Sequence, residues 1–230
     1  MYERIDGSKK PRLVVADSHP AMIEGICVIL EDDFEVVGTV TDGRNLLDLA
    51  SQLHPDAVVL DVQLPSLNGF EATRNLLNLD RTIKVLIYSF HDGAGYLGEA
   101  ISAGASGYVL KTSANSELIK GLQQILRGNT YLQGSAQQLH KSDHARRGTS
   151  RLFRELTPRQ REVLQLVCEG KSAKMIAAIL NISSKTVEFH KAAMMDALQV
   201  STSAELIRYA VERGMFGPPA AKLLPASASN

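Results

Sequence analysis

Five short apolar runs alternate with five amphipathic segments between Arg12 and Arg127. The runs span three to seven residues, and several are rich in Val and Ile, as strands buried within a sheet are. Strands that alternate with helices form a parallel sheet with helices on both faces. This part of the chain therefore predicts an α/β domain of the flavodoxin-like (βα)5 type, with strand order 2-1-3-4-5. We expect strands at 13–16, 34–40, 57–60, 83–88 and 108–110, and helices near 19–31, 44–53, 69–79, 94–103 and 115–127.

The pattern changes after the fifth helix. Residues 129–152 are polar and offer few side chains that could pack, which indicates a linker. From Leu156 the pattern is purely helical, and Thr157, Pro158 and Gln160 form a helix start signal. Four short helices with a tight turn at 181–183 predict an all-α helix-turn-helix domain. We expect an N-terminal tail at 1–11, the α/β domain at 12–128, the linker at 129–152, the helical domain at 153–216 and a disordered tail at 217–230.

The 230 residues carry no net charge, but the charge is divided unevenly. Residues 1–128 hold 11 Lys and Arg against 17 Asp and Glu, whereas residues 129–230 hold 14 against 8. A basic half favours a nucleic-acid partner, and chance segregation of solvated charge is the alternative. No apolar run approaches the roughly 18 residues of a membrane span. The two cysteines lie far apart in helical patterns, so we expect reduced thiols, a cytoplasmic protein and no membrane partner.

Polar residues follow four of the predicted strands: Asp17 the first, Asp61 the third, Ser89 the fourth and Lys111 the fifth. In the order 2-1-3-4-5 these strands are neighbours, so their carboxyl ends would line one crevice. Two carboxylates suit Mg²⁺ shared with a phosphate, while a Lys and a hydroxyl suit phosphoryl oxygens. A central carboxylate can also be the nucleophile that forms an aspartyl-phosphate. Polar residues that merely cap the sheet are the alternative.

The stretches "VVADSHP", "DAVVLDVQLPSLNGFE", "VLIYSFHD" and "GASGYVLK" resemble the receiver domain of two-component response regulators. The resemblance implies that Asp61 accepts a phosphoryl group from a sensor histidine kinase, with Ser89 and Lys111 sensing that group. It makes Tyr108 the aromatic switch residue on the output face. It also implies Mg²⁺, which we expect to be held by Asp17, Asp61 and the Gln63 backbone, with Ser18 as a weak further ligand.

Ser18 departs from the receiver pattern, which has two adjacent acids after the first strand. A hydroxyl offers the metal a neutral oxygen, but the site loses one full negative charge. We therefore expect an atypical acidic pocket with reduced Mg²⁺ affinity, and weaker phosphorylation wherever that depends on the metal.

The segment "LTPRQREVLQLVCEGKSAKMIA" followed by "ISSKTVEFHK" resembles the LuxR-type output domain of the NarL/FixJ regulators. The resemblance implies that the helix 184–198 enters the major groove of double-stranded DNA, and that the active protein is a homodimer. Projected as a helix, Val187, Met194 and Leu198 face inward. The expected DNA contacts are Lys174, Lys185, His190 and Lys191 to phosphates, with Glu188, Phe189 and Ala192 facing bases. The expected dimerisation residues are Leu206, Ile207 and Ala210, whose apolar stripe could equally be core packing.

The end of the predicted recognition helix also departs from its family. Basic residues and a glycine are usual there, whereas this chain has Asp196, Ala197 and Gln199. Each lost cation removes a phosphate contact, and Asp196 adds repulsion, so we expect modest DNA affinity with a shallow salt dependence. Gln199 must either adopt a left-handed backbone or let the helix run on.

These observations predict a DNA-binding transcriptional response regulator, not an enzyme beyond self-phosphorylation from a donor and slow self-dephosphorylation. Ser18 favours an alternative in which DNA binding is controlled without phosphorylation. Asp196 and Ala197 favour a second, a protein-binding adaptor with reduced DNA affinity. A phosphatase with an aspartyl nucleophile is disfavoured, because it usually needs an acid where Gln63 stands.

Overall fold

The computed structural model describes residues 9–133 and 156–212, which fall in two compact units, residues 1–154 and 155–230. The expectations for most of the N-terminal tail, for the linker beyond residue 133 and for the C-terminal tail lie outside the described residues. The described part of the first unit contains six strands and five helices, and that of the second contains helices alone.

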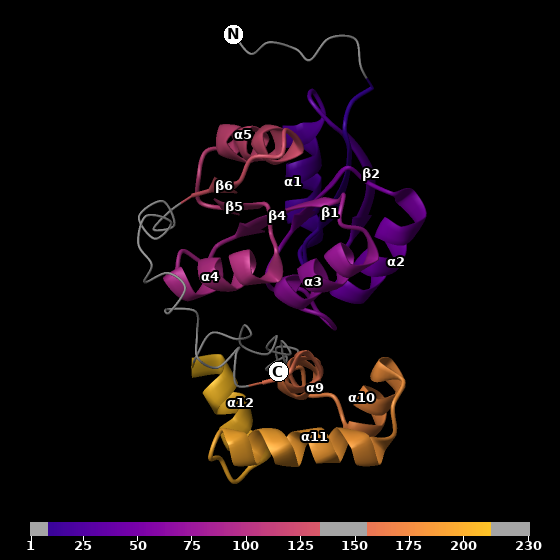
Figure 1. The fold of residues 1–230 in the computed structure, drawn as a ribbon, viewed down its shortest axis with the longest axis vertical. Helices are drawn as coiled ribbons and strands as arrows, with labels where there is room; N and C mark the ends of the chain where they lie inside the picture. The colour runs from indigo at the N-terminus through magenta and orange to yellow at the C-terminus, as the bar shows by residue number, and fades with distance from the viewer. Residues whose placement is uncertain (1–8, 134–155, 213–230) are drawn as a thin grey trace, which may run out of the picture. The chain divides into compact units, whose positions relative to one another are not determined.

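The first unit is built on a single parallel sheet in the order β2-β1-β3-β4-β5-β6 (Figure 1). The predicted order of the first five strands is confirmed, and a sixth strand is added beyond β5. The strands are β1 (Arg12–Ala16), β2 (Glu35–Val40), β3 (Ala57–Leu60), β4 (Lys84–Ser89), β5 (Gly107–Leu110) and β6 (Tyr131–Leu132).

Helices cover both faces of this sheet, with α1 and α5 on one side and α2, α3 and α4 on the other (Figure 1). Side-chain caps fix two of their starts: Asp42 accepts from the backbone at the start of α2, and Asn68 does so at the start of α3. Such caps satisfy amide groups that have no partner within the helix. The helices are α1 (Pro20–Leu30), α2 (Gly43–Leu53), α3 (Gly69–Leu79), α4 (Ala94–Ala103) and α5 (Asn115–Leu126).

The core on the α1 and α5 side joins residues that are far apart in the chain. Leu13 and Val15 from β1 are fully buried against Ile26 of α1 and Leu118 and Leu122 of α5. Burial of each such side chain contributes roughly 1.5–3 kcal/mol. This packing holds the strands in register and thereby fixes where their carboxyl ends lie.

The strand β6 corrects the predicted start of the linker at residue 129. Tyr131 and Leu132 pair in parallel with Gly107 and Tyr108, so they belong to the sheet. The sequence of residues 129–152 does not predict this strand, because a strand of two residues is too short to show a periodic pattern. The sheet unit therefore continues to Gln133, whose backbone N–H donates to the Tyr108 carbonyl.

The second unit consists, in its described part, of α9 (Pro158–Cys168), α10 (Ala173–Leu180), α11 (Ser184–Ala197) and α12 (Ser203–Glu212). The predicted helix start is confirmed, since Thr157 and Gln160 form a reciprocal capping box. Asn181 takes a left-handed backbone (φ 52°) and turns the chain from α10 into α11. Gln199 is also left-handed (φ 55°), so α11 ends at the expected place instead of running on. In neither described stretch is a helix long and apolar enough to cross a membrane.

Candidate functional site

The carboxyl ends of four neighbouring strands meet at one edge of the sheet. The parallel ladder continues one residue beyond the strands, because the Asp61 N–H donates to Ala16 O (2.9 Å) and the Lys111 N–H to Ser89 O (2.8 Å). Asp17 is the residue after Ala16, so backbone hydrogen bonds alone place Asp17, Asp61 and Lys111 around one point.

Lys111 joins the two carboxylates. Its Nζ lies 2.5 Å from Asp17 Oδ2 and 3.2 Å from Asp61 Oδ2. All three side chains are buried, Lys111 and Asp17 to 1% exposure. Burying three charges is costly unless they pair, and this arrangement leaves the cluster with one negative charge more than positive. The structure thus brings these three residues together, as the strand order predicts.

The environment makes Asp61 more basic than an ordinary Asp. Burial raises the pKa of its carboxyl, and the nearby Asp17 carboxylate raises it further. Lys111 and a hydrogen bond from the Gln63 backbone N–H lower that pKa, but they do not cancel the effect of burial. A carboxylate that is more basic is also a better nucleophile, provided that it is ionised.

The hydroxyl of Ser18 is engaged outside this cluster. Ser18 Oγ lies 3.0 Å from His19 Nδ1, and the same ring nitrogen lies 3.3 Å from Asp17 Oδ1. The His19 backbone N–H also donates to Asp17 Oδ1 at 2.9 Å. Asp17 is thus held by the backbone and by Lys111, while Ser18 adds no contact to Asp61 among the described hydrogen bonds.

Ser89 and Tyr108 both bind His91 in the loop between β4 and α4. Ser89 is fully buried, and its hydroxyl accepts from the His91 N–H. The Tyr108 hydroxyl donates to the His91 carbonyl at 2.6 Å, and burial raises the pKa of that hydroxyl. The His91 ring stacks on Tyr96, with centroids 4.1 Å apart. Tyr108 therefore points inward, bound to the loop that follows Ser89.

The loop after Asp61 folds tightly back onto β3. The Gly69 N–H donates to Val62 O at 2.9 Å, and a Cβ at Gly69 would come within 2.3 Å of the Asp61 carbonyl oxygen. Only a residue without a side chain fits, so glycine at position 69 is required by the close approach of the loop to the Asp61 backbone.

Sequence reasoning missed a buried ion network between α3 and α4. The Arg74 guanidinium pairs with Glu71, at 2.7 Å, and with Glu99. Both acids are nearly inaccessible to solvent. The spacing of Glu71 and Arg74 on one helix could have suggested the first pair, but no local pattern announces the contact with Glu99, 25 residues further on.

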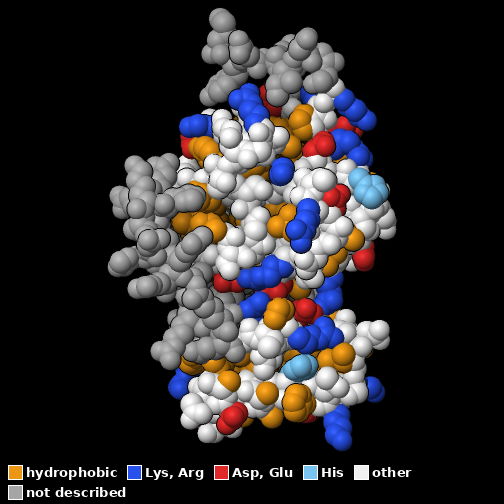
Figure 2. Space-filling model, in the orientation of Figure 1, with side chains coloured by type: hydrophobic (Ala, Val, Ile, Leu, Met, Phe, Trp, Pro, Cys, Tyr) orange, Lys and Arg blue, Asp and Glu red, His pale blue; other side chains and the backbone are white. Residues whose placement is uncertain are grey.

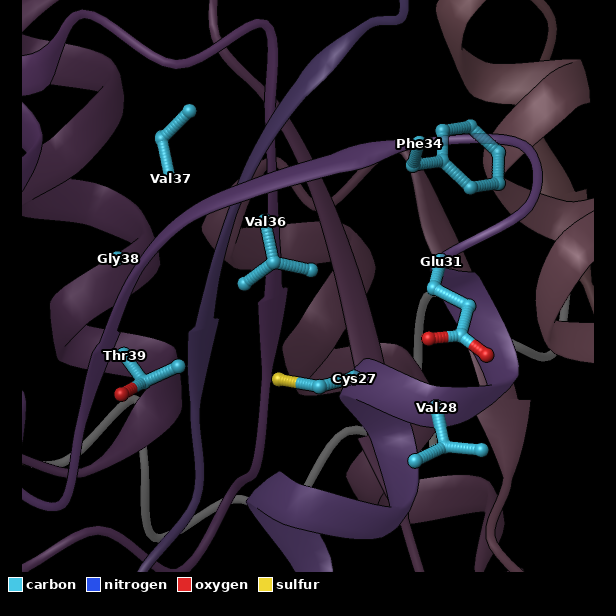
Figure 3. A pocket seen from close by; sticks show the side chains of 8 residues that line it. All are labelled: Cys27, Val28, Glu31, Phe34, Val36, Val37, Gly38 and Thr39. Atoms are coloured by element: carbon cyan, nitrogen blue, oxygen red, sulfur yellow. The ribbon is translucent and has the colours of Figure 1, made fainter.

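A hollow elsewhere in the first unit has no cluster of charged side chains like that of Asp17, Asp61 and Lys111. It lies between α1 and β2, and its lining combines apolar side chains with one acid, Glu31 (Figure 3). Within the described stretches, no group of three or more His, Cys, Asp or Glu side chains is placed to hold a metal ion. The lining residues are Cys27, Val28, Glu31, Phe34, Val36, Val37, Gly38 and Thr39.

In the second unit, α11 has the two faces that its sequence predicts. Val187, Met194 and Leu198 are buried. The outer face presents Phe189, whose side chain is 69% exposed although it is large and apolar. Figure 2 shows hydrophobic side chains at the surface over this helix. The other exposed residues of this face and its flank are Lys185, Glu188, Ala192 and Asp196, with Lys174 exposed on α10.

An ion pair on α11 was not foreseen. Lys191 Nζ lies 3.2 Å from a carboxylate oxygen of Glu188, one helical turn away. An exposed pair of this kind contributes at most about 1 kcal/mol, so an approaching partner can break it. His190 is half-buried and meets the Phe189 ring edge-on at 6.0 Å between centroids.

The three residues of α12 that are expected to form a dimer contact differ in exposure. Leu206 and Ala210 are fully buried within the unit, so these two side chains pack in its core, which is the alternative to dimerisation. Ile207 is partly exposed on α12. Of the three expected contacts, Ile207 alone keeps surface that a second copy could reach without rearrangement of the unit.

Comparison with protein families gives two matches. Residues 13–123 match the family described as response regulator receiver domain. Residues 154–210 match the family described as bacterial regulatory proteins, luxR family. The two matched ranges correspond to the two units of the fold.

Individual proteins are similar along nearly the whole chain. The transcriptional regulatory protein MctR of Rhizobium johnstonii is 32% identical over 208 residues, which cover 90% of this chain and 95% of that protein. The transcriptional regulatory protein DesR of Bacillus subtilis is 33% identical, covering 84% and 91%. Among solved structures, RcsB from Salmonella enterica serovar Typhimurium, bound to a promoter in the presence of a phosphomimetic, is 25% identical with a TM-score of 0.62, covering 87% and 98%.

Proposed function

This chain belongs to the response regulators that join a receiver domain to a LuxR-type DNA-binding domain, and we propose that Asp61 is its phosphoryl acceptor, supplied by a sensor histidine kinase. The observation that carries the proposal is the Lys111 ammonium shared between the buried carboxylates of Asp17 and Asp61. A regulator of this kind acts by binding double-stranded DNA, and its chemistry is confined to its own phosphorylation.

The cluster supplies what an in-line transfer to a carboxylate requires. Asp61 attacks phosphorus through a carboxylate oxygen, and the bond from phosphorus to the donor breaks as the new one forms. Lys111, already 3.2 Å from that carboxylate, pairs with the oxygens of the incoming group. Ser89 and Tyr108 both hydrogen-bond the His91 backbone, so a shift of the Ser89 hydroxyl toward the phosphoryl group would release the His91 N–H beside the carbonyl that Tyr108 binds.

Asp17, Asp61 and the Gln63 carbonyl are the groups that would hold Mg²⁺. Their fit is adequate, because Mg²⁺ is commonly bound through one or two carboxylates together with water and phosphate oxygens. When bound, it would neutralise charge on the phosphoryl oxygens. The Ser18 hydroxyl is turned to His19, so the site offers two carboxylates where three would be usual in this family, and we propose weak binding.

The output would pass through the exposed face of α11. In this proposal Phe189 contacts the methyl group of thymine and Glu188 accepts from cytosine. Phosphates are contacted by Lys185, Lys174, His190 and Lys191. We propose that the phosphorylated protein binds DNA as a homodimer in the cytoplasm, with phosphorylation shifting the population of receiver states.

The test is incubation of the full chain with a small phosphodonor, with and without Mg²⁺, read as intact mass. We expect one added phosphoryl group in the presence of Mg²⁺ and none in Asp61→Asn. The matched control is Asp56→Asn, an exposed carboxylate that follows no strand, which should label like the wild type.

A wild-type protein that takes no phosphoryl group at any Mg²⁺ concentration would contradict the proposal. A promoter-fragment shift by that unlabelled protein would then identify a regulator controlled without phosphorylation. Absence of both labelling and DNA binding would instead favour the protein-binding adaptor.

A further inference from the structure

Gln133 is the last described residue before the segment that leads to the second unit, and its side chain is fully engaged by the receiver. Its Oε1 accepts from the Ser113 hydroxyl (2.8 Å) and from the Leu110 N–H (3.2 Å). Its Nε2 donates to Glu117 Oε2 at 2.9 Å.

The Gln133 amide spans both sides of Lys111. Leu110 immediately precedes Lys111, and Ser113 lies two residues after it, so one side-chain oxygen pins the short loop from both sides. The backbone adds to this hold, since the Gln133 N–H donates to Tyr108 O at 3.0 Å. The loop that carries the Lys111 ammonium is thus held by a residue that follows β6, the strand that the sequence does not predict.

Glu117 completes the arrangement from α5. Its Oε2 accepts from Gln133 and also from the Tyr131 hydroxyl, so two side chains tie β6 and the residue after it to α5, while the backbone ladder ties β6 to β5. Partly buried hydrogen bonds among several groups strengthen one another and restrict the geometry of all of them.

We propose that Gln133 is a positioning residue for Lys111 and connects the phosphoryl site with the start of the interdomain segment. This inference rests on the proposed phosphorylation of Asp61. When Lys111 turns to a phosphoryl group, the loop that Gln133 holds must adjust, and Gln133, at the end of the described receiver, adjusts with it. If these hydrogen bonds hold the loop in place, their loss leaves Lys111 less well positioned beside Asp61.

The experiment compares the full-length wild type with Gln133→Ala in two measurements. The first is the rate of labelling by a small phosphodonor with Mg²⁺, which we expect to fall about fivefold, the effect of one or two lost hydrogen bonds. The second is amide hydrogen exchange of the unphosphorylated protein, which we expect to rise at Leu110–Ser113 and not in α1 or α2.

Two further variants keep the result interpretable. Thr130→Ala, an exposed neighbour on the same segment, should leave both measurements unchanged. Gln133→Glu should behave like Gln133→Ala, because its carboxylate faces the Glu117 carboxylate. Adding Glu117→Gln to that variant restores an amide donor opposite a carboxylate acceptor, so the double variant should recover labelling.

Wild-type labelling and exchange in Gln133→Ala would overturn the proposal. So would a fall in labelling accompanied by faster exchange throughout the receiver, since that is general destabilisation. If the wild type itself takes no phosphoryl group, the function proposed for Asp61 fails, and this positioning role fails with it. The exchange measurement then still reports separately whether Gln133 holds the loop.

Discussion

At the scale of single residues, the site was readable from the sequence wherever its members follow strands. Asp17, Asp61 and Lys111 could be placed together because the ends of neighbouring parallel strands must converge. The bond between Ser18 and His19 could not be foreseen, because both side chains rotate freely in an isolated chain. The same holds for Gln133, whose side-chain partners lie 16 to 23 residues away along the chain.

Ser18→Asp should strengthen magnesium binding. The added carboxylate restores a full charge beside Asp17, and we expect the Mg²⁺ concentration for half-maximal phosphodonor labelling to fall about tenfold. Ser18→Ala is the control, and it should change little because the hydroxyl is engaged by His19. Equal Mg²⁺ requirements in all three proteins would mean that position 18 does not contribute to the site.

Asp61→Asn should raise thermal stability at neutral pH. Burial raises the pKa of Asp61 in the folded state, so folding favours its protonated form, and the wild type loses stability as pH rises from the unfolded pKa through the folded one. The neutral amide escapes that loss. The difference in unfolding temperature should shrink as pH falls toward about 4, near the ordinary Asp value. A less stable variant at pH 7 would show that pairing with Lys111 outweighs burial.

At the scale of elements, the five strand–helix units and the capped start of α9 follow from local rules, and they appear within a residue or two of their predicted places. The strand β6 does not, because two residues carry no periodicity. Buried ion pairs such as Arg74 with Glu99 are likewise products of packing between helices.

Gly69→Ala should destabilise the receiver by about 3 kcal/mol, because its Cβ would collide with the Asp61 carbonyl oxygen. Gly25→Ala is the matched control: this exposed position inside α1 has nothing within 4 Å of an added Cβ. It should gain about 1 kcal/mol from improved helix propensity. Chemical denaturation of both variants measures the contrast, and similar values for the two would refute the collision.

Asp196→Lys should strengthen DNA binding by α11. The substitution removes a repulsive charge from the outer face and offers a phosphate contact, so the log–log dependence of affinity on salt should steepen by about one. Asp196→Asn, which removes only the charge, should lie between the two proteins. Fluorescence anisotropy with a labelled duplex provides the measurement. An unchanged slope in Asp196→Lys would place this residue away from the DNA.

At the scale of the whole molecule, the chain forms two units with separate cores, as the change from alternating to helical periodicity indicates. Calorimetry should therefore resolve two unfolding transitions. Gly69→Ala should lower one of them and leave the other in place, because its collision lies inside the first core. A single transition that shifts as a whole would show that the units unfold together.

The sixth strand also determines where the receiver can be separated from the rest of the chain. A fragment that stops at Gly128 lacks β6 and leaves the outer edge of β5 without its partner strand. Bare sheet edges template association between molecules, so such a fragment should aggregate, whereas one that extends through Gln133 should stay monodisperse. During synthesis, likewise, the sheet stays incomplete until Tyr131 and Leu132 have left the ribosome, although their composition suggests a linker.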